Sequence, residues 1–217
     1  METPTLPTRL LFIRHGKQIG VGERTAAERS DPPLSDQGHA QAAQLSKVLA
    51  AELTSVKPLL IASSPMRRAL MTATPSAAAL KATLLVHGAC FEYGCAGTAH
   101  YGSGRDSIHA ISPNADLTHI GPNGEWEYTG SSSSETEEEA KQRAKAVVAW
   151  LRDDVVPRHH GGAALLFAHQ TFLDLVLQLL LTGSDAAWTY GMPRHKLSHA
   201  GVARVVAHAD GRFIKES

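Results

Sequence analysis

Leu10-Leu11-Phe12-Ile13-Arg14-His15-Gly16 is an apolar run that ends abruptly in a cation, an imidazole and a glycine. The apolar part predicts a buried strand over residues 10–14. Its carboxyl end lies where open α/β sheets place their ligands. The arrangement suits an imidazole nucleophile that faces a phosphate, with Arg14 holding oxygens and Gly16 allowing close backbone approach. Three residues are a weak signal by themselves, because a histidine at a strand end is more often structural.

Two further segments carry basic residues at the ends of predicted strands. Residues 59–73 indicate a strand, a turn and a helix, with Ser64 as N-cap and Pro65 at the first helical position. Arg68 then lies in the first turns, near a helix N-terminus that attracts anions. Residues 163–168 form another apolar run, which ends in His169-Gln170 before a helix. Three strands of one sheet would bring these basic groups to a single edge.

Taken together, these motifs resemble those of the histidine phosphatase (phosphoglycerate mutase-like) superfamily, in that family's order and roughly its spacing. The resemblance spans residues 10 to 180 and includes residues 31–38, which are similar to the family's Pro-Leu-(Ser/Thr)-x-x-Gly segment before a long helix. Phe91-Glu92-Tyr93-Gly94 resembles its acid-bearing segment. The resemblance implies a phosphoglycerate mutase-like fold and chemistry through a phosphorylated histidine.

Alternating strands and helices predict a three-layer α/β/α sandwich with a mostly parallel central sheet. We expect strands at 10–14, 58–63, 83–87 and 163–168, a helix broken near Pro75, and helices at 135–156 and 171–181. A ribbon, 201–207 and 212–215, turns at Asp210-Gly211. The helix that begins at Ser35 has an apolar stripe with helical spacing: Ala42, Leu45, Val48, Leu49 and Leu53.

Length and charge limit the classes of function. The chain has 217 residues, and we expect a single domain over 1–217. Residues 88–134 are rich in Gly, Ser, Pro and Asn and predict an irregular insertion that roofs the active site. Because 21 basic residues balance 21 acidic ones, there is no electrostatic case for nucleic-acid binding.

The environment of the protein is predicted from weaker signals. The longest apolar run, 172–181, carries Asp174 and Gln178 and is too short to cross a membrane. Cys90 and Cys95 predict no disulfide, since nothing in the sequence marks secretion. We therefore expect a cytoplasmic protein, either a monomer or a homodimer, that contacts neither membrane nor nucleic acid.

The proposed chemistry assigns a role to each basic group. His15 attacks phosphorus to give a phosphohistidine, while Arg14, Arg68 and His169 hold the phosphoryl oxygens. Gln170 is a further candidate for phosphate binding. Only one of Arg67 and Arg68 can face the phosphate, because helix neighbours point about 100° apart, and the motif register selects Arg68.

A carboxylic acid has to protonate the leaving group. Glu92 is the first candidate, on the motif position, and it later serves as the base for water. A phosphate dianion beside it would raise its pKa and keep it protonated near neutrality. Glu125 and Glu127 are the rival carboxyls.

The substrate is less constrained by the sequence. Possible substrate-binding residues are Lys17, Gln18, Arg24 and Arg105, with Arg29 and His100 as further loop candidates. The histidine groupings (195 and 199; 100, 109 and 119) lack the carboxylate spacing of metal sites, so we expect no metal and no cofactor.

The leading hypothesis is a metal-independent phosphatase acting on a small phosphorylated metabolite, with a phosphoprotein as a possible substrate. The alternatives are a phosphoglycerate mutase-type isomerase and a catalytically silent module that binds a phospho-ligand or a protein. A mutase must grip a second phosphate, and residues 93–118 lack the clustered Lys and Arg that this requires.

Overall fold

The computed structural model describes the chain except for residues 1–5, 26–27, 97–101, 103, 127–132 and 217. Within the described residues, strands join in one sheet in the order β4-β3-β2-β5-β1-β6-β7. Neighbours from β4 to β1 are parallel, whereas β6 and β7 run antiparallel. The strands are β1 (Thr8–Arg14), β2 (Leu59–Ser63), β3 (Leu84–His87), β4 (Asp116–His119), β5 (Ala163–Ala168), β6 (Val202–Ala207) and β7 (Phe213–Lys215).

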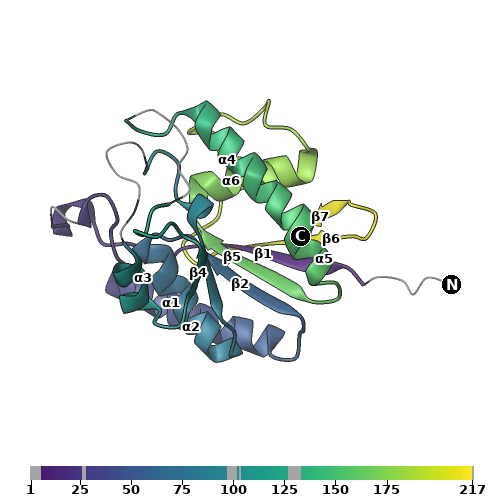
Figure 1. Ribbon diagram of the computed structural model, residues 1–217, viewed down its shortest axis with the longest axis horizontal. Coiled ribbons are helices and arrows are strands. Elements are labelled where there is room, and N and C mark those ends of the chain that lie inside the picture. Colours follow the sequence, from purple (N-terminus) through teal and green to yellow (C-terminus); the bar gives the residue numbers. More distant parts are fainter. Residues whose placement is uncertain (1–5, 26–27, 97–101, 103, 127–132, 217) are drawn as a thin grey trace.

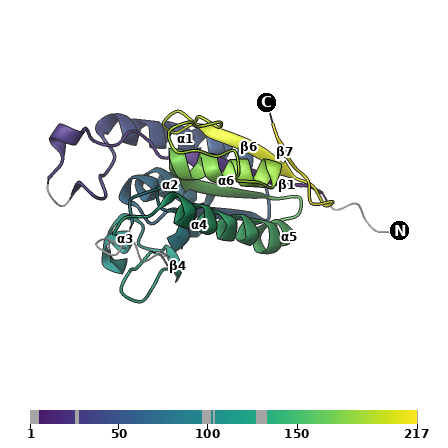
Figure 2. The same ribbon diagram turned by 90° about the horizontal axis from the view of Figure 1, so that it is seen from above.

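Helices cover both faces of this sheet, as Figures 1 and 2 show. One face carries α1, α2 and α3, and the other carries α4 and α6. The three-layer α/β/α sandwich with a mostly parallel sheet is therefore confirmed. The α-helices are α1 (Asp36–Leu53), α2 (Arg67–Leu80), α3 (Arg105–Ile111), α4 (Glu137–Trp150), α5 (Val156–Arg158) and α6 (Gln170–Thr182), with single turns η1 (Val21–Glu23), η3 (Gly88–Cys90) and the π-helical η4 (Leu151–Val155).

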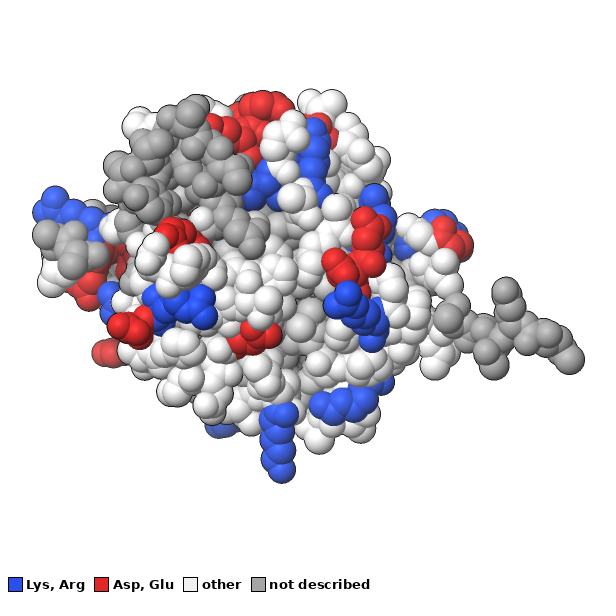
Figure 3. All heavy atoms as spheres, viewed as in Figure 1, with Lys and Arg blue, Asp and Glu red and all other residues white. Residues whose placement is uncertain are grey.

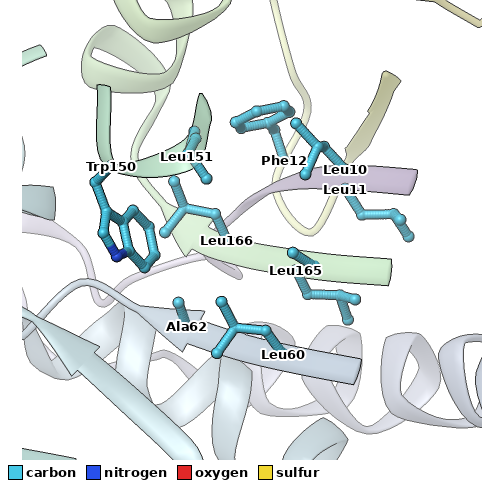
Figure 4. A pocket seen from close by; sticks show the side chains of 10 residues that line it. Leu10, Leu11, Phe12, Leu60, Ala62, Trp150, Leu151, Leu165 and Leu166 are labelled. Carbon is cyan, nitrogen blue, oxygen red and sulfur yellow. The ribbon is translucent and has the colours of Figure 1, made fainter. Parts of the chain in front are cut away.

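Strand β1 supplies both layers of the core. Its side chains alternate, so Leu10 and Phe12 pack under α4 and α6 while Leu11 and Ile13 pack under α1 and α2. A small pocket lies between β1, β2, β5 and the end of α4, and its lining side chains are all hydrophobic (Figure 4). It offers no polar group to a ligand and is part of the core.

The second helix differs from the prediction at its start and at its proline. Met66 is the N-cap and α2 begins at Arg67, because the Ser64 hydroxyl accepts the Met66 N–H within the preceding turn. Pro75 does not break the helix, which continues to Leu80. A proline removes one backbone hydrogen bond, and the buried face of α2 outweighs that loss.

The first helix confirms its predicted stripe except at one position. Val48 is 47 % exposed, whereas Leu45, Leu49 and Leu53 are buried. Positions 45, 49 and 53 follow one another at four-residue spacing, and residue 48 is about 100° away from 49 around the helix axis. The prediction that Val48 belongs to the core was wrong for this reason.

Residues 88–134 are less irregular than predicted. They include α3 and β4, and β4 extends the sheet by pairing with β3. Ile108 and Leu117 are buried beside α2, which explains why α3 and β4 form despite the weak periodicity of their sequence. The prediction that this segment roofs the active site remains a prediction.

The remaining elements depart from expectation only at their ends. The third predicted helix, expected at 135–156, begins at Glu137, where Thr136 and Glu139 form a capping box, and passes into the π-turn before α5. The ribbon is confirmed as β6 and β7, with Gly211 at φ +83° in the turn. On the face drawn in Figure 3, acidic and basic side chains are interspersed.

Candidate active site

Three neighbouring strands end at the candidate site. β5 lies between β2 and β1, so Ser64, His169 and His15 follow adjacent carboxyl ends. The backbone ties these ends together, because His15 N–H donates to Ala168 and Ser64 N–H donates to Phe167. The rings of His15 and His169 have centroids 5.2 Å apart. The sequence therefore predicted correctly that the two histidines meet at one sheet edge.

His15 is held with one ring nitrogen available for attack. Its Nδ1 lies 2.6 Å from the Gly16 carbonyl oxygen. A carbonyl only accepts hydrogen bonds, so Nδ1 carries the proton and Nε2 keeps its lone pair. Burial, with the nearby Arg68 cation, lowers the pKa of His15 to about 2. The imidazole is therefore neutral and nucleophilic at neutral pH.

Gly16 is required for a different contact from the one predicted. A Cβ at this position would lie 2.8 Å from the Gly38 carbonyl oxygen, in the first turn of α1. The Gly16 N–H donates to the Thr72 hydroxyl, which in turn donates to the Arg68 carbonyl. The glycine thus allows β1, α1 and α2 to meet closely behind His15.

Arg68, rather than Arg67, reaches His15. Its Nε lies 3.3 Å from His15 Nε2, and its Nη1 lies 3.8 Å from the buried Asp31 carboxylate. Asp31 also accepts the backbone N–H of Arg67, so it anchors the first turn of α2. The Arg67 side chain turns outward, where it lies 3.9 Å from Glu28.

Two buried donors beside His15 have no hydrogen-bond partner among the described residues. They are Arg14 Nε and His169 Nδ1. The Ser64 hydroxyl, which accepts from Met66 N–H, can donate its own proton to His169 Nε2 at 2.7 Å, leaving Nδ1 protonated. Buried polar groups are seldom left unpaired. Together with Arg68, these donors fit an oxyanion placed against His15.

Glu92 lies at the N-terminus of α6. Its carboxylate accepts the backbone N–H groups of Tyr93, Thr171 and Phe172 at 2.9–3.3 Å. Burial raises the pKa of Glu92, and the Arg68 cation and these N–H donors oppose that rise. A carboxyl with a raised pKa beside the basic cluster can act as an acid.

Comparison with known proteins defines the family. The model of the histidine phosphatase superfamily (branch 1) matches residues 10–216. The chain belongs to this superfamily. A search of curated proteins finds no match.

Solved structures of histidine phosphatases share the fold. One is a mycobacterial glucosyl-3-phosphoglycerate phosphatase in complex with VO3, with 24 % identity and a TM-score of 0.64 over 97 % of this chain and 98 % of that one. Another is the ecdysone phosphate phosphatase of Bombix mori in complex with tungstate, with 17 % identity and a TM-score of 0.64 over 97 % and 92 %.

Within this histidine phosphatase framework, the side chain of Gln170, which was predicted to bind phosphate, is engaged by backbone groups of the protein, and the phosphate role stays a prediction. Its amide oxygen accepts the Leu197 N–H at 2.7 Å, and its amide nitrogen donates to the His195 carbonyl at 3.0 Å. The side chain anchors the segment between α6 and β6. A polar residue at the start of a helix looks the same in sequence whether it binds an anion or a neighbouring loop.

Of the predicted substrate contacts, two are engaged elsewhere. Arg105 Nη1 donates to the carbonyls of Leu117, Ile120 and Gly121, and its role as a substrate contact stays a prediction. Arg24 Nη2 donates to the Ile19 carbonyl. Arginine side chains often donate to such carbonyls, and no sequence signal separates this use from substrate binding.

The other candidates are placed as follows. Lys17 and Gln18 line an open groove beside the N-terminus of α1, where Lys17 Nζ donates to Gln37. Arg29 is exposed, and His100 and Glu127 lie outside the described residues. The rival carboxyl Glu125 accepts from Asn123 in its own exposed turn.

The site contains one histidine that sequence analysis considered only as a metal ligand. The ring centroid of His199 lies 5.8 Å from that of His15, and its Nε2 lies 3.3 Å from Arg14 Nη2. The one feature that could have placed His199 in the site is its position just before β6, the strand that pairs antiparallel with β1. In the described residues, no three His, Cys, Asp or Glu side chains group as a metal site would require.

The same described residues contain no helix with the length and hydrophobicity needed to span a bilayer.

Proposed function

We propose that this protein is a metal-independent phosphatase that hydrolyses a phosphomonoester through a phosphohistidine on His15. The observation that carries the proposal is the state of that imidazole. Its Nδ1 is fixed by the Gly16 carbonyl, and its Nε2 faces Arg68. Two unpaired donors, Arg14 Nε and His169 Nδ1, stand beside it.

The first half of the reaction forms the phosphoenzyme. His15 Nε2 attacks phosphorus, the bond between phosphorus and the leaving oxygen breaks, and Glu92 gives its proton to that oxygen. Negative charge spreads over the equatorial oxygens, which Arg14, Arg68 and His169 stabilise. These fixed cations and donors supply the charge that the transition state needs.

The second half releases phosphate. Glu92, now ionised, takes a proton from water, whose oxygen attacks the phosphohistidine. The phosphorus–nitrogen bond breaks, which restores neutral His15 and the protonated carboxyl. Both half-reactions therefore use one carboxyl, first as an acid and then as a base.

The nature of the substrate is a further part of the proposal. The two related structures named above hold the oxyanions tungstate and VO3, of which tungstate is tetrahedral and doubly charged, as a phosphate dianion is. A small phosphorylated metabolite in the cytoplasm is the substrate that we favour. A mutase is less supported, because Arg105, the sole Lys or Arg in residues 93–118, is occupied by loop carbonyls.

The test compares the unaltered protein with His15→Ala and His160→Asn on an aryl phosphate in EDTA, between pH 5 and 8. We expect turnover that resists EDTA, disappears in His15→Ala and persists in His160→Asn, whose imidazole is exposed. Acid-labile phosphate on the enzyme should accompany it. Absence of both turnover and phosphoenzyme in the unaltered protein would refute the proposal.

A further inference from the structure

A third histidine, His199, lies beside the nucleophile. Its ring centroid is 5.8 Å from that of His15, close to the 5.2 Å that separates His15 from His169. His199 precedes β6, which pairs antiparallel with β1 and so begins at the edge where β1 ends. His199 is partly exposed, which leaves it accessible to a ligand in the site.

The backbone on both sides of His199 is bonded to the site. The Leu197 carbonyl accepts from Arg14 Nη1 at 2.8 Å, and the Leu197 N–H donates to Gln170. On the other side, Ala200 N–H donates to the His15 carbonyl at 3.2 Å. The ring therefore stands beside His15 because its segment is anchored at several points.

The contact with Arg14 defines the proton on His199. A guanidinium only donates, so Nε2 accepts from Arg14 Nη2 at 3.3 Å and Nδ1 carries the single proton of a neutral ring. The charged and titratable groups that face this ring among the described residues are Arg14, Lys17 and His15. Burial and the two cations lower the pKa of His199 in the ligand-free site.

A phosphate dianion reverses this balance. Placed against His15 and Arg14, it brings two negative charges next to the ring and engages the guanidinium that Nε2 contacts. Nearby negative charge favours the protonated form of an imidazole. The proton comes from solvent and returns there when the anion leaves.

We propose that His199 is a further phosphoryl-binding residue, which takes up a proton as the dianion binds and donates a hydrogen bond to one of its oxygens. This inference rests on the proposed function in that the ligand is a phosphoryl group. It adds a fourth donor to Arg14, Arg68 and His169. It also makes oxyanion binding depend on pH near neutrality.

The experiment measures tungstate binding by calorimetry in two buffers of different ionisation enthalpy at pH 6, 7 and 8. Tungstate stays a dianion over this range, so protons taken up belong to the protein. We expect net proton uptake in the unaltered protein and in the exposed-histidine control His160→Asn. In His199→Asn the uptake should fall below that of the unaltered protein, the remainder coming from Glu92, and affinity at pH 6 should fall roughly tenfold or more.

Asparagine is chosen because its amide oxygen can still accept from Arg14, whereas His199→Ala removes that contact as well. If His199→Asn keeps both the affinity and the proton uptake, the inference is wrong and His199 only supports Arg14. If the unaltered protein neither binds tungstate nor turns over a phosphomonoester, the proposed function fails first. Thermal unfolding of each variant shows that the fold is retained.

Discussion

Arg143 is bonded to Phe91, the residue that precedes the candidate acid. Its Nη1 donates to the Phe91 carbonyl at 3.0 Å, and its guanidinium lies 3.6 Å from the Phe91 ring centroid. On the other side it lies 4.2 Å from the ring of Phe172, whose N–H donates to Glu92. Arg143 therefore holds the backbone that presents Glu92 against the N-terminus of α6.

The partner of Arg143 makes its loss costly. Glu135 forms a bidentate pair with it at 2.6 and 2.7 Å, and the two side chains are 1 % and 5 % exposed. Arg143→Met leaves a buried carboxylate unpaired, and we expect the free energy of unfolding to fall by about 3–5 kcal/mol. The matched control is Arg204→Met, which breaks a partly exposed pair with Glu52 and should cost about 1 kcal/mol or less.

Urea unfolding at pH 7 measures this difference, and equal losses in the two variants would contradict the buried-pair argument. Among molecules that remain folded, Arg143→Met should also slow the hydrolysis of alkyl phosphates more than that of 4-nitrophenyl phosphate. An alkoxide needs the proton of Glu92 to leave, and nitrophenolate does not. A purely structural loss would lower both rates alike.

Glu92→Gln tests the acid directly. The amide oxygen can take the place of Oε1 and still accept the N–H groups of Tyr93 and Phe172, whereas the acceptor for Thr171 N–H and the proton donor are lost. We expect turnover of an alkyl phosphate to fall roughly 100- to 10,000-fold. The loss on 4-nitrophenyl phosphate should be much smaller, and Glu125→Gln should leave both rates unchanged. A uniform loss on all substrates would show that Glu92 is not the acid.

The raised pKa of Glu92 also has a consequence for stability. Burial raises this pKa above its value in the unfolded chain, so the folded state binds the proton more tightly. Its contribution to stability is present at low pH and is lost as pH rises above about 4.3 through the raised pKa. Glu92→Gln cannot lose a proton. The free energy of unfolding of this variant, relative to that of the unaltered protein, should therefore increase as pH rises from 5 to 8. Parallel profiles in urea would contradict this.

Much of the site could be predicted because each motif residue follows an apolar strand. Arg14, His15 and His169 stand at strand ends, and strands of one parallel sheet meet at one edge. The period of apolar residues locates such strands without knowledge of what pairs with them. The positions of these basic groups thus followed from local sequence alone.

The rest depends on pairings that the local sequence does not encode. His199 reaches the site because β6 turns back antiparallel beside β1. Arg143 lies in a helix with charged neighbours and looks like a surface residue until Glu135 is placed against it. Gln170 and Arg105 bind backbone carbonyls or N–H groups whose location depends on the folded loops.

Arg68 and Arg67 form a natural matched pair, because they are adjacent and only Arg68 contacts His15. Arg68→Gln removes the cation that lies 3.3 Å from His15 Nε2, and we expect kcat/KM for an aryl phosphate to fall roughly 100-fold or more. Arg67→Gln removes an outward charge and should stay within about twofold of the unaltered protein. Steady-state kinetics at pH 7 decide between them. Similar losses in both would overturn the assignment of Arg68.

The last prediction concerns acid stability and His87 at the end of β3. Its ring is 4 % exposed, stacks on His119 at 4.4 Å, and accepts the Ala89 N–H through Nδ1 at 3.2 Å. Burial, with His119 beside it, lowers the pKa of His87 to about 3. In the unfolded chain a histidine titrates near about 6.5. The unfolded state therefore binds a proton in a range of pH where the folded state does not.

The stability that depends on neutral His87 is present above about pH 6.5 and is lost as pH falls toward 3. One such proton changes the free energy of unfolding by about 1.4 kcal/mol per pH unit, or about 2 kcal/mol between pH 6.5 and 5. His87→Gln should lessen the acid loss of stability by this amount, whatever the substitution costs at pH 7. Urea unfolding at pH 5, 6 and 7 measures the slope of the free energy of unfolding against pH. The control is His160→Asn, which alters an exposed histidine and should leave this slope unchanged. An unchanged slope in His87→Gln would show that His87 is protonated in the folded protein.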